Sequence, residues 1–202
     1  AIKALSPAVI YCDEFDQEEA PRGSWQGDNG VSSRLRKIRF TFTSDPDNRG
    51  KIISIYTTNR PDLLDSADKR SGRGSVRIPM LLPDSSEREA IFSIMPKKHS
   101  FAAEVKNFKS IAEISEKKHG DLVSGADIEE ISTSAYHKTV LADKNIVDEG
   151  DYIYAIDDFV PHHYAGDAIR KMEMQAVRER SSNRFLSERG KSILSSLERT
   201  GK

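Results

Sequence analysis

The sequence predicts an α/β fold, in which part of a parallel sheet is followed by a bundle of helices. Two runs, residues 8–12 and 51–58, indicate the sheet, because they are apolar on both faces and end in polar side chains. From residue 84 onward apolar residues recur at helical spacing. We expect residues 1–83 to hold the sheet, residues 84–160 to form a helical unit, and residues 161–202 to add a C-terminal helix and tail.

The first strand leads directly into two acids, Asp13 and Glu14. Ligands of parallel α/β sheets bind at the carboxyl ends of the strands. Two acids beside a buried strand are costly unless a cation or a reacting water uses them. The pattern is that of a Walker B site, where the first acid holds Mg²⁺ and the second polarises the water that attacks the γ-phosphate. An ordinary strand end is the alternative, because many strands end in an acid.

Between the two runs, residues 31–42 have the amphipathic spacing of a helix, with one apolar face. Their basic residues fall mostly on the other faces and are Arg34, Arg36, Lys37 and Arg39. Charge runs usually solvate a helix, so we interpret this basic face as a solvated or subunit-interface surface rather than a nucleic-acid contact.

The second apolar run continues into a longer pattern, IYTTNRPDLLDSADKRSGR at residues 55–73. With Asp13 and Glu14 before it, this segment resembles the second region of homology of AAA+ ATPases. The resemblance covers roughly residues 1–160. It implies part of a P-loop NTPase core, with the Walker B, sensor 1 and last strands, followed by an α-helical lid. The last strand is expected at residues 76–82, and Pro83 ends the core.

The resemblance also implies a role for each matching side chain. Asp13 corresponds to the Mg²⁺-associated acid and Glu14 to the catalytic acid. Asn59 corresponds to sensor 1, which lies between the attacking water and the γ-phosphate. Arg70 and Arg73 correspond to arginine fingers that act on a neighbouring subunit's nucleotide, which suits the charge stabilisation that phosphoryl transfer needs. A solvated basic turn is the alternative for the two arginines, and Gly74-Ser75 replaces the usual Phe-Asp after them.

A third match, HGDLVSGADI at residues 119–128, resembles the segment that opens the sensor 2 helix of the lid. Ser124 is an expected N-cap, with Asp127 completing an acidic capping box. Gly125 and Ala126 are small enough for a planar base to approach, and in the family this segment borders the adenine. Ile94 and Met95 also match positions near the adenine. A capped helix without ligand contact, and a core role for Ile94 and Met95, are equally good interpretations.

The lid match also favours one clade of the family. Ala126 stands where some AAA+ clades carry a sensor 2 arginine. Absence of that arginine is typical of the protein-remodelling clade that includes the valosin-containing protein and the FtsH proteases. The resemblance therefore implies that the protein acts on a macromolecule, and a protein substrate is favoured.

No G-x-x-x-x-G-K-[ST] segment occurs in the sequence. In the family this phosphate-binding loop precedes Walker B, so we expect the chain to be the C-terminal portion of an AAA+ protein. Alone, it should be inactive as an ATPase. In the C-terminal part, a helix is predicted over about residues 167–182, and the Ser-, Arg- and Lys-rich tail is expected to be frayed or to act as an interaction arm.

The composition of the chain argues against two classes of binding partner, nucleic acids and anionic membranes. It has 202 residues, 37% of them hydrophobic and 31% charged, with a net charge of −1. Such a balance gives no general attraction to nucleic acid or anionic membranes. No apolar run is long enough to span a bilayer. The single cysteine, Cys12, lies in the first strand as a small core residue and permits no disulfide framework, which indicates a cytoplasmic protein.

Two functions follow from the resemblance. The favoured one is part of an ATPase that uses ATP and Mg²⁺ in a homo-oligomeric ring, hexameric by family resemblance, to remodel a protein. The alternative is a catalytically inactive scaffold subunit that lends Arg70 and Arg73 to a partner's site. Intact Glu14 and Asn59 favour the first, because an inactive subunit has no need of them.

Overall fold

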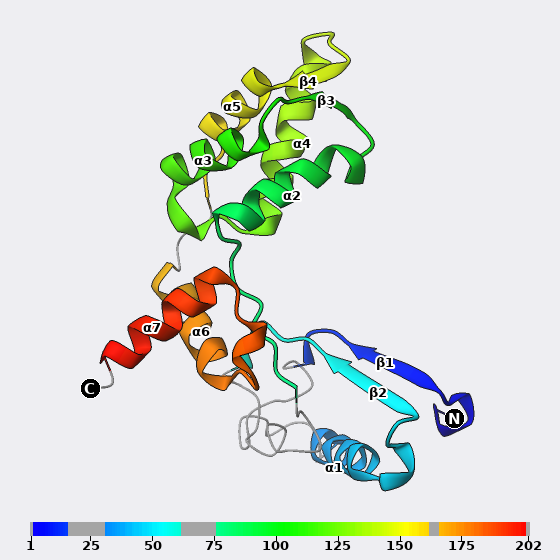
Figure 1. Ribbon diagram of the computed structural model, residues 1–202. Coiled ribbons are helices and arrows are strands. Elements are labelled where there is room, and N and C mark those ends of the chain that lie inside the picture. Colours follow the sequence, from blue (N-terminus) through cyan, green and yellow to red (C-terminus); the bar gives the residue numbers. More distant parts are fainter. Residues whose placement is uncertain (1, 16–30, 62–75, 162–165, 201–202) are drawn as a thin grey trace. The chain divides into compact units, whose positions relative to one another are not determined.

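The computed structural model describes residues 2–15, 31–61, 76–161 and 166–200 (Figure 1). It divides into two compact units, each built from two stretches of the chain. The first unit takes residues 1–79 and 174–185, and the second takes residues 80–173 and 186–202. The expected division at residue 83 stays a prediction.

The first unit contains a two-stranded parallel sheet. Strand β1, Ala8–Cys12, pairs with β2, Ile52–Tyr56, in the register Ala8↔Ile52 to Cys12↔Tyr56. The chain between them includes helix α1, Val31–Ser44, and a 3₁₀ turn, Pro46–Asn48. Another 3₁₀ turn, Ile2–Leu5, precedes β1. Parallel strands need a long crossover of this kind, so the predicted parallel pair and the intervening helix are confirmed.

One expectation about this sheet was wrong. Both strands were expected to be buried on both faces, but their residues alternate between half-buried and exposed. The exposed side chains, which are 46% to 64% accessible, are Val9, Tyr11, Ile53 and Ile55. The register places Val9 beside Ile53 and Tyr11 beside Ile55. One apolar face of the sheet is therefore uncovered by the described residues.

The structure also differs from the expectation of a strand at residues 76–82. This segment is neither helix nor strand. Its Arg77 N–H donates to Ser181 Oγ at 3.0 Å, and the Ser181 N–H donates to the Arg77 carbonyl at 3.1 Å. A strand exists only as part of a hydrogen-bonded ladder, and the described residues offer this segment no strand neighbour.

The second unit consists mainly of helices, with one short parallel strand pair (Figure 1). Its elements, in chain order, are α2 Ser85–Lys98, β3 Ala102–Glu104, α3 Phe108–His119, the 3₁₀ turn Gly120–Leu122, α4 Gly125–Leu141, β4 Ile146–Asp148 and α5 Glu149–Asp158. Helix α6, Gly166–Glu179, confirms the helix predicted over residues 167–182 and contributes to both units. A 3₁₀ turn, Asn183–Phe185, follows it.

Local signals fix where three of these helices begin. Asp84 caps α2 in a capping box with Glu87, and Ser124 caps α4 in one with Asp127. The cap at Ser124 was predicted, and it is confirmed. Asp148 caps α5 in the same way. Each cap satisfies backbone N–H groups that have no partner within the helix, which stabilises a helix start by about 1 kcal/mol.

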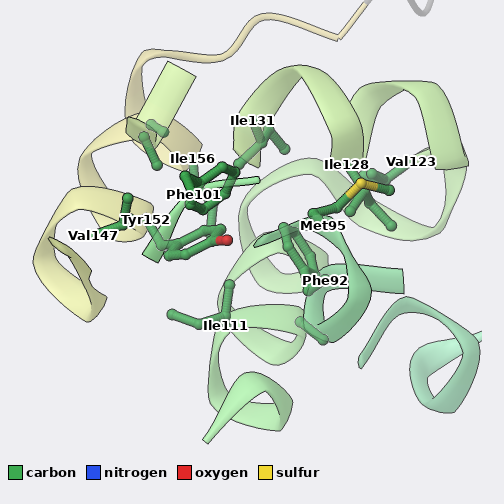
Figure 2. Close-up of a cluster of buried hydrophobic side chains, with 13 residues drawn as sticks. Phe92, Met95, Phe101, Ile111, Val123, Ile128, Ile131, Val147, Tyr152 and Ile156 are labelled. Atoms are coloured by element: carbon green, nitrogen blue, oxygen red, sulfur yellow. The ribbon is translucent and has the colours of Figure 1, made fainter. Parts of the chain in front are cut away.

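The core of the second unit lies between its helices, as Figure 2 shows. Tyr152 of α5 is fully buried and meets two rings edge-on, with centroid distances of 6.0 Å to Phe92 and 5.9 Å to Phe108. Burial raises the pKa of Tyr152 to about 12, so its hydroxyl stays neutral. Met95 is 4% exposed and belongs to this core. Of its two sequence interpretations, the core role is therefore the one the structure supports.

The tail forms a helix, α7, Glu188–Thr200, so the expected frayed end was wrong for these residues. Arg189 anchors it, with Nε and Nη2 each 2.8 Å from a Glu173 carboxylate oxygen and Nη1 3.3 Å from Asp121 Oδ2. Burial opposes ionisation of Asp121, but Arg189 and Arg170 outweigh it and lower the pKa of Asp121. Helical periodicity in the sequence does not predict a bidentate ion pair between residues that are far apart in the chain.

Replacing Asp151 by Asn should destabilise the second unit by about 2 kcal/mol. The carboxylate is 1% exposed, and its Oδ2 accepts from Thr139 Oγ1 at 2.9 Å and from the Asp148 N–H at 3.2 Å. Its Oδ1 lies 3.2 Å from Lys138 Nζ. Asn replaces one of these oxygens by an amide donor that faces another donor. Urea unfolding followed by circular dichroism checks this, with Asp148→Asn as a control that keeps a good N-cap and should change stability by less than about 0.5 kcal/mol.

The pH dependence of unfolding gives a second readout of Asp151. Burial opposes its ionisation, but hydrogen bonds from Asp148 and Thr139 and the nearby lysines lower its pKa below 3.8. Its contribution to stability is therefore complete above that value and is lost as the pH falls through the lower, folded pKa. Asp151→Asn should flatten the acid limb of the stability profile. An unchanged limb would show that this carboxylate is not stabilised in its charged form.

Candidate functional site

Polar residues meet at the carboxyl edge of the β1–β2 sheet. Asp13 directly follows β1 and Thr57 directly follows β2. The Thr57 hydroxyl donates to Asp13 Oδ1, and the Thr57 N–H donates to the Cys12 carbonyl at 3.0 Å. Ligands of parallel sheets bind at this edge, so the structure places Asp13 where the sequence predicted a site.

The backbone turns sharply at Glu14, which has a left-handed conformation with φ +49°. Its N–H donates to Asp13 Oδ1 at 3.0 Å. Non-glycine residues in this region cost roughly 1–3 kcal/mol and cluster at functional sites. The strained residue at this edge is thus the acid that the sequence singled out for water activation.

Phe15 anchors the acidic turn. It is 4% exposed, and its N–H donates to the Thr57 carbonyl at 2.9 Å. Its ring lies 4.5 Å from that of Tyr56, while the Arg39 guanidinium lies 4.2 Å above it. One residue of the basic face of α1 therefore holds the acidic turn through a cation–π contact rather than facing solvent. Phe15 lies three residues past β1, and the sequence analysis did not foresee this contact.

The predicted sensor residue, Asn59, lies in the segment that follows β2. Asn59 is exposed and lies three residues beyond β2. Beside it, Thr58 Oγ1 accepts from the Arg60 N–H at 2.9 Å. The hydrogen bond that reaches Asp13 from this segment comes from Thr57, which the sequence analysis missed. Arg70 and Arg73 lie outside the described residues.

The donor set at this edge fits magnesium. Mg²⁺ keeps several waters and is usually held by one or two carboxylates together with substrate phosphates. No cluster of three or more His, Cys, Asp or Glu side chains occurs among the described residues, so a protein cage of the calcium or zinc type is absent from them. Asp13 can supply the single carboxylate that a nucleotide-bound Mg²⁺ needs.

The predicted adenine-side residues belong to the second unit. Ile94 of α2 is 55% exposed, unlike its core neighbour Met95. Gly125 and Ala126 open α4 directly after the Ser124 cap. A Cβ built on Gly125 would meet no atom within 4 Å, so the chain's own packing does not require glycine there. Space beside this helix start is compatible with the approach of a ligand.

Comparison with known proteins identifies the family. The profile described as "ATPase family associated with various cellular activities (AAA)" matches residues 1–81, which include the whole β1–β2 edge. The chain belongs to the AAA family. Its AAA region is thus an α/β core fragment, and the helices that follow form an α-helical lid.

Three relatives show how much of this AAA chain is similar to known proteins. A proteasome-activating nucleotidase of Methanoculleus marisnigri is 31% identical over 168 residues, 80% of this chain and 39% of the relative. An ATP-dependent zinc metalloprotease FtsH of Mycoplasmoides gallisepticum is 29% identical over 196 residues, 88% of this chain and 25% of the relative. A cell division cycle protein 48 homolog of Archaeoglobus fulgidus is 35% identical over 133 residues, 66% of this chain and 17% of the relative.

The similarity covers only part of each relative. The chain spans 39% or less of the length of these three proteins. The family match and these relatives make the chain similar to AAA proteins of the protein-remodelling clade. Within the described residues, every helix falls short of the length and apolarity that crossing a bilayer requires.

Proposed function

We propose that the chain is part of an AAA ATPase that couples ATP hydrolysis to the remodelling of a protein. The observation that carries this proposal is the parallel β1–β2 edge, where Asp13 and the strained Glu14 follow one strand and Thr57 to Asn59 follow the other. This edge lies inside the region that matches the AAA family. The printed names of the relatives, among them a proteasome-activating nucleotidase, support a protein substrate.

Asp13 and Glu14 divide the work at the sheet edge. In this proposal Asp13 would hold the magnesium of Mg-ATP, by way of a bound water, and Glu14 would accept a proton from the attacking water as general base. Bound Mg²⁺ would neutralise charge on the β- and γ-phosphates. Asn59 orients the attacking water against the γ-phosphate. The left-handed backbone at Glu14 turns the chain directly after Asp13. This turn is consistent with different roles for two acids that are adjacent in sequence.

The family resemblance supports roles for the remaining predicted residues. Arg70 and Arg73 act as arginine fingers on the nucleotide of a neighbouring subunit, which requires a homo-oligomeric ring, hexameric by family resemblance. Ile94, Gly125 and Ala126 border the adenine. The exposure of Ile94 and the open space beside Gly125 support these assignments. We place the protein in the cytoplasm, where its single free cysteine would stay reduced.

A comparison of two proteins tests the ATPase proposal. The full-length protein should hydrolyse ATP in a Mg²⁺-dependent manner, whereas the 202-residue chain by itself should not. The reason is that its sequence contains no G-x-x-x-x-G-K-[ST] loop, whose amides and lysine hold the phosphates. Phosphate release measured for both proteins at matched concentrations decides the question. A full-length protein without ATPase activity would support the scaffold alternative, and turnover by the short chain would contradict the assigned phosphate site.

A further inference from the structure

Thr57 makes three hydrogen bonds to the end of strand β1 and to the acidic turn that follows it. Its N–H donates to the Cys12 carbonyl at 3.0 Å, and its carbonyl accepts from the Phe15 N–H at 2.9 Å. Its hydroxyl donates to Asp13 Oδ1. Two of these bonds use the backbone and would form with any non-proline residue at this position. Only the bond to Asp13 depends on the side chain.

The hydroxyl bond fixes the orientation of the Asp13 carboxylate. Oδ1 accepts from the Thr57 hydroxyl and from the Glu14 N–H at 3.0 Å, one donor from each strand end. Two hydrogen-bond donors on the same oxygen restrict the rotation of the carboxylate group. Neither of these bonds uses Oδ2. Groups that orient a metal-associated carboxylate usually contribute to metal affinity.

We propose that Thr57 is a positioning residue, which holds the Asp13 carboxylate so that Oδ2 receives a water of nucleotide-bound Mg²⁺. This inference rests on the proposed ATPase function of the same edge. Threonine suits the task because its β-branched side chain has a restricted χ1 angle at the end of a strand. The donor is thereby aimed at Asp13 at little cost in side-chain entropy. Thr57 touches neither nucleotide nor reacting water and acts through Asp13.

Binding of a fluorescent ATP analogue to the full-length protein, titrated with Mg²⁺, tests this role without measuring turnover. Thr57→Val keeps the branched shape and removes only the donor, so it should raise the Mg²⁺ concentration for half-maximal binding about tenfold. Binding in excess EDTA should be unchanged, because the hydroxyl acts only through the metal. Thr57→Ser keeps the donor and should stay within about twofold of the wild type.

Control variants separate this role from a general effect on folding. Thr41→Val makes the same substitution on α1, where the exposed hydroxyl donates to the Lys37 carbonyl at 3.0 Å, and its Mg²⁺ dependence should equal that of the wild type. Thr57→Ala is a second donor-free variant should Thr57→Val fail to fold. A wild-type Mg²⁺ dependence in either folded donor-free variant, or an equal loss of binding in EDTA, would overturn the role of Thr57. Absence of Mg²⁺-dependent binding in the wild type would instead overturn the proposed function.

Discussion

Replacing Glu14 by Gln in the full-length protein should lower ATP turnover by roughly 10²–10⁴-fold while ATP remains bound. Gln keeps the size of the side chain and removes the carboxylate that we propose as the proton acceptor for the attacking water. Asp13 keeps its bonds, because the Glu14 backbone N–H and the Thr57 hydroxyl are untouched by the change. The Asp13 carboxylate therefore stays oriented, and nucleotide affinity should change little.

Steady-state phosphate release and equilibrium binding of a fluorescent ATP analogue separate the two effects. Glu104→Gln, an exposed position on β3, is the matched control and should leave both values unchanged. If Glu14→Gln weakens nucleotide binding as much as it slows turnover, then Glu14 serves binding rather than catalysis. If turnover persists, another residue activates the water.

Short sequence patterns were enough to predict those parts of the fold that are stabilised by interactions between residues close together in the chain. Ser124 was recognised as a cap because a short polar side chain followed three residues later by an acid satisfies backbone donors within one turn. The β1–β2 pair was recognised because an apolar run followed by polar residues indicates a strand in a parallel sheet. In these places the pattern that selects the structure lies within about ten residues.

What the sequence analysis missed depends on contacts between distant segments. The Thr57 hydroxyl reaches Asp13 only because the parallel register aligns the ends of β1 and β2. Arg39 belongs to a charge run that usually faces solvent, yet it covers Phe15. Residues 76–82 have the composition of a strand, but a strand also needs a neighbour. Arg189, in the first turn of helix α7, pairs with Glu173, and periodicity within the tail does not reveal that contact.

Replacing either Arg70 or Arg73 by Ala should lower turnover of the full-length protein by roughly 10³-fold, the lower limit for arginine fingers. A guanidinium supplied by the neighbouring subunit stabilises charge on the transferring phosphoryl group, and alanine leaves that charge uncompensated. Nucleotide affinity of the isolated subunit should change little, since in our proposal each finger acts on another subunit's site. Arg178→Ala, at an exposed position on α6, is the control and should keep wild-type turnover.

Mixing subunits then distinguishes action between subunits from action within one. An Arg73→Ala subunit keeps Glu14, and a Glu14→Gln subunit keeps both arginines, so each is inactive in a ring of its own kind. In a mixed ring, the site of an Arg73→Ala subunit receives an intact finger from a Glu14→Gln neighbour and regains a complete set of catalytic groups. Turnover should therefore rise above that of either variant alone and fall again on dilution below the assembly concentration. Mixtures that never exceed the separate variants, with a specific rate unaffected by dilution, would place Arg70 and Arg73 outside the shared site.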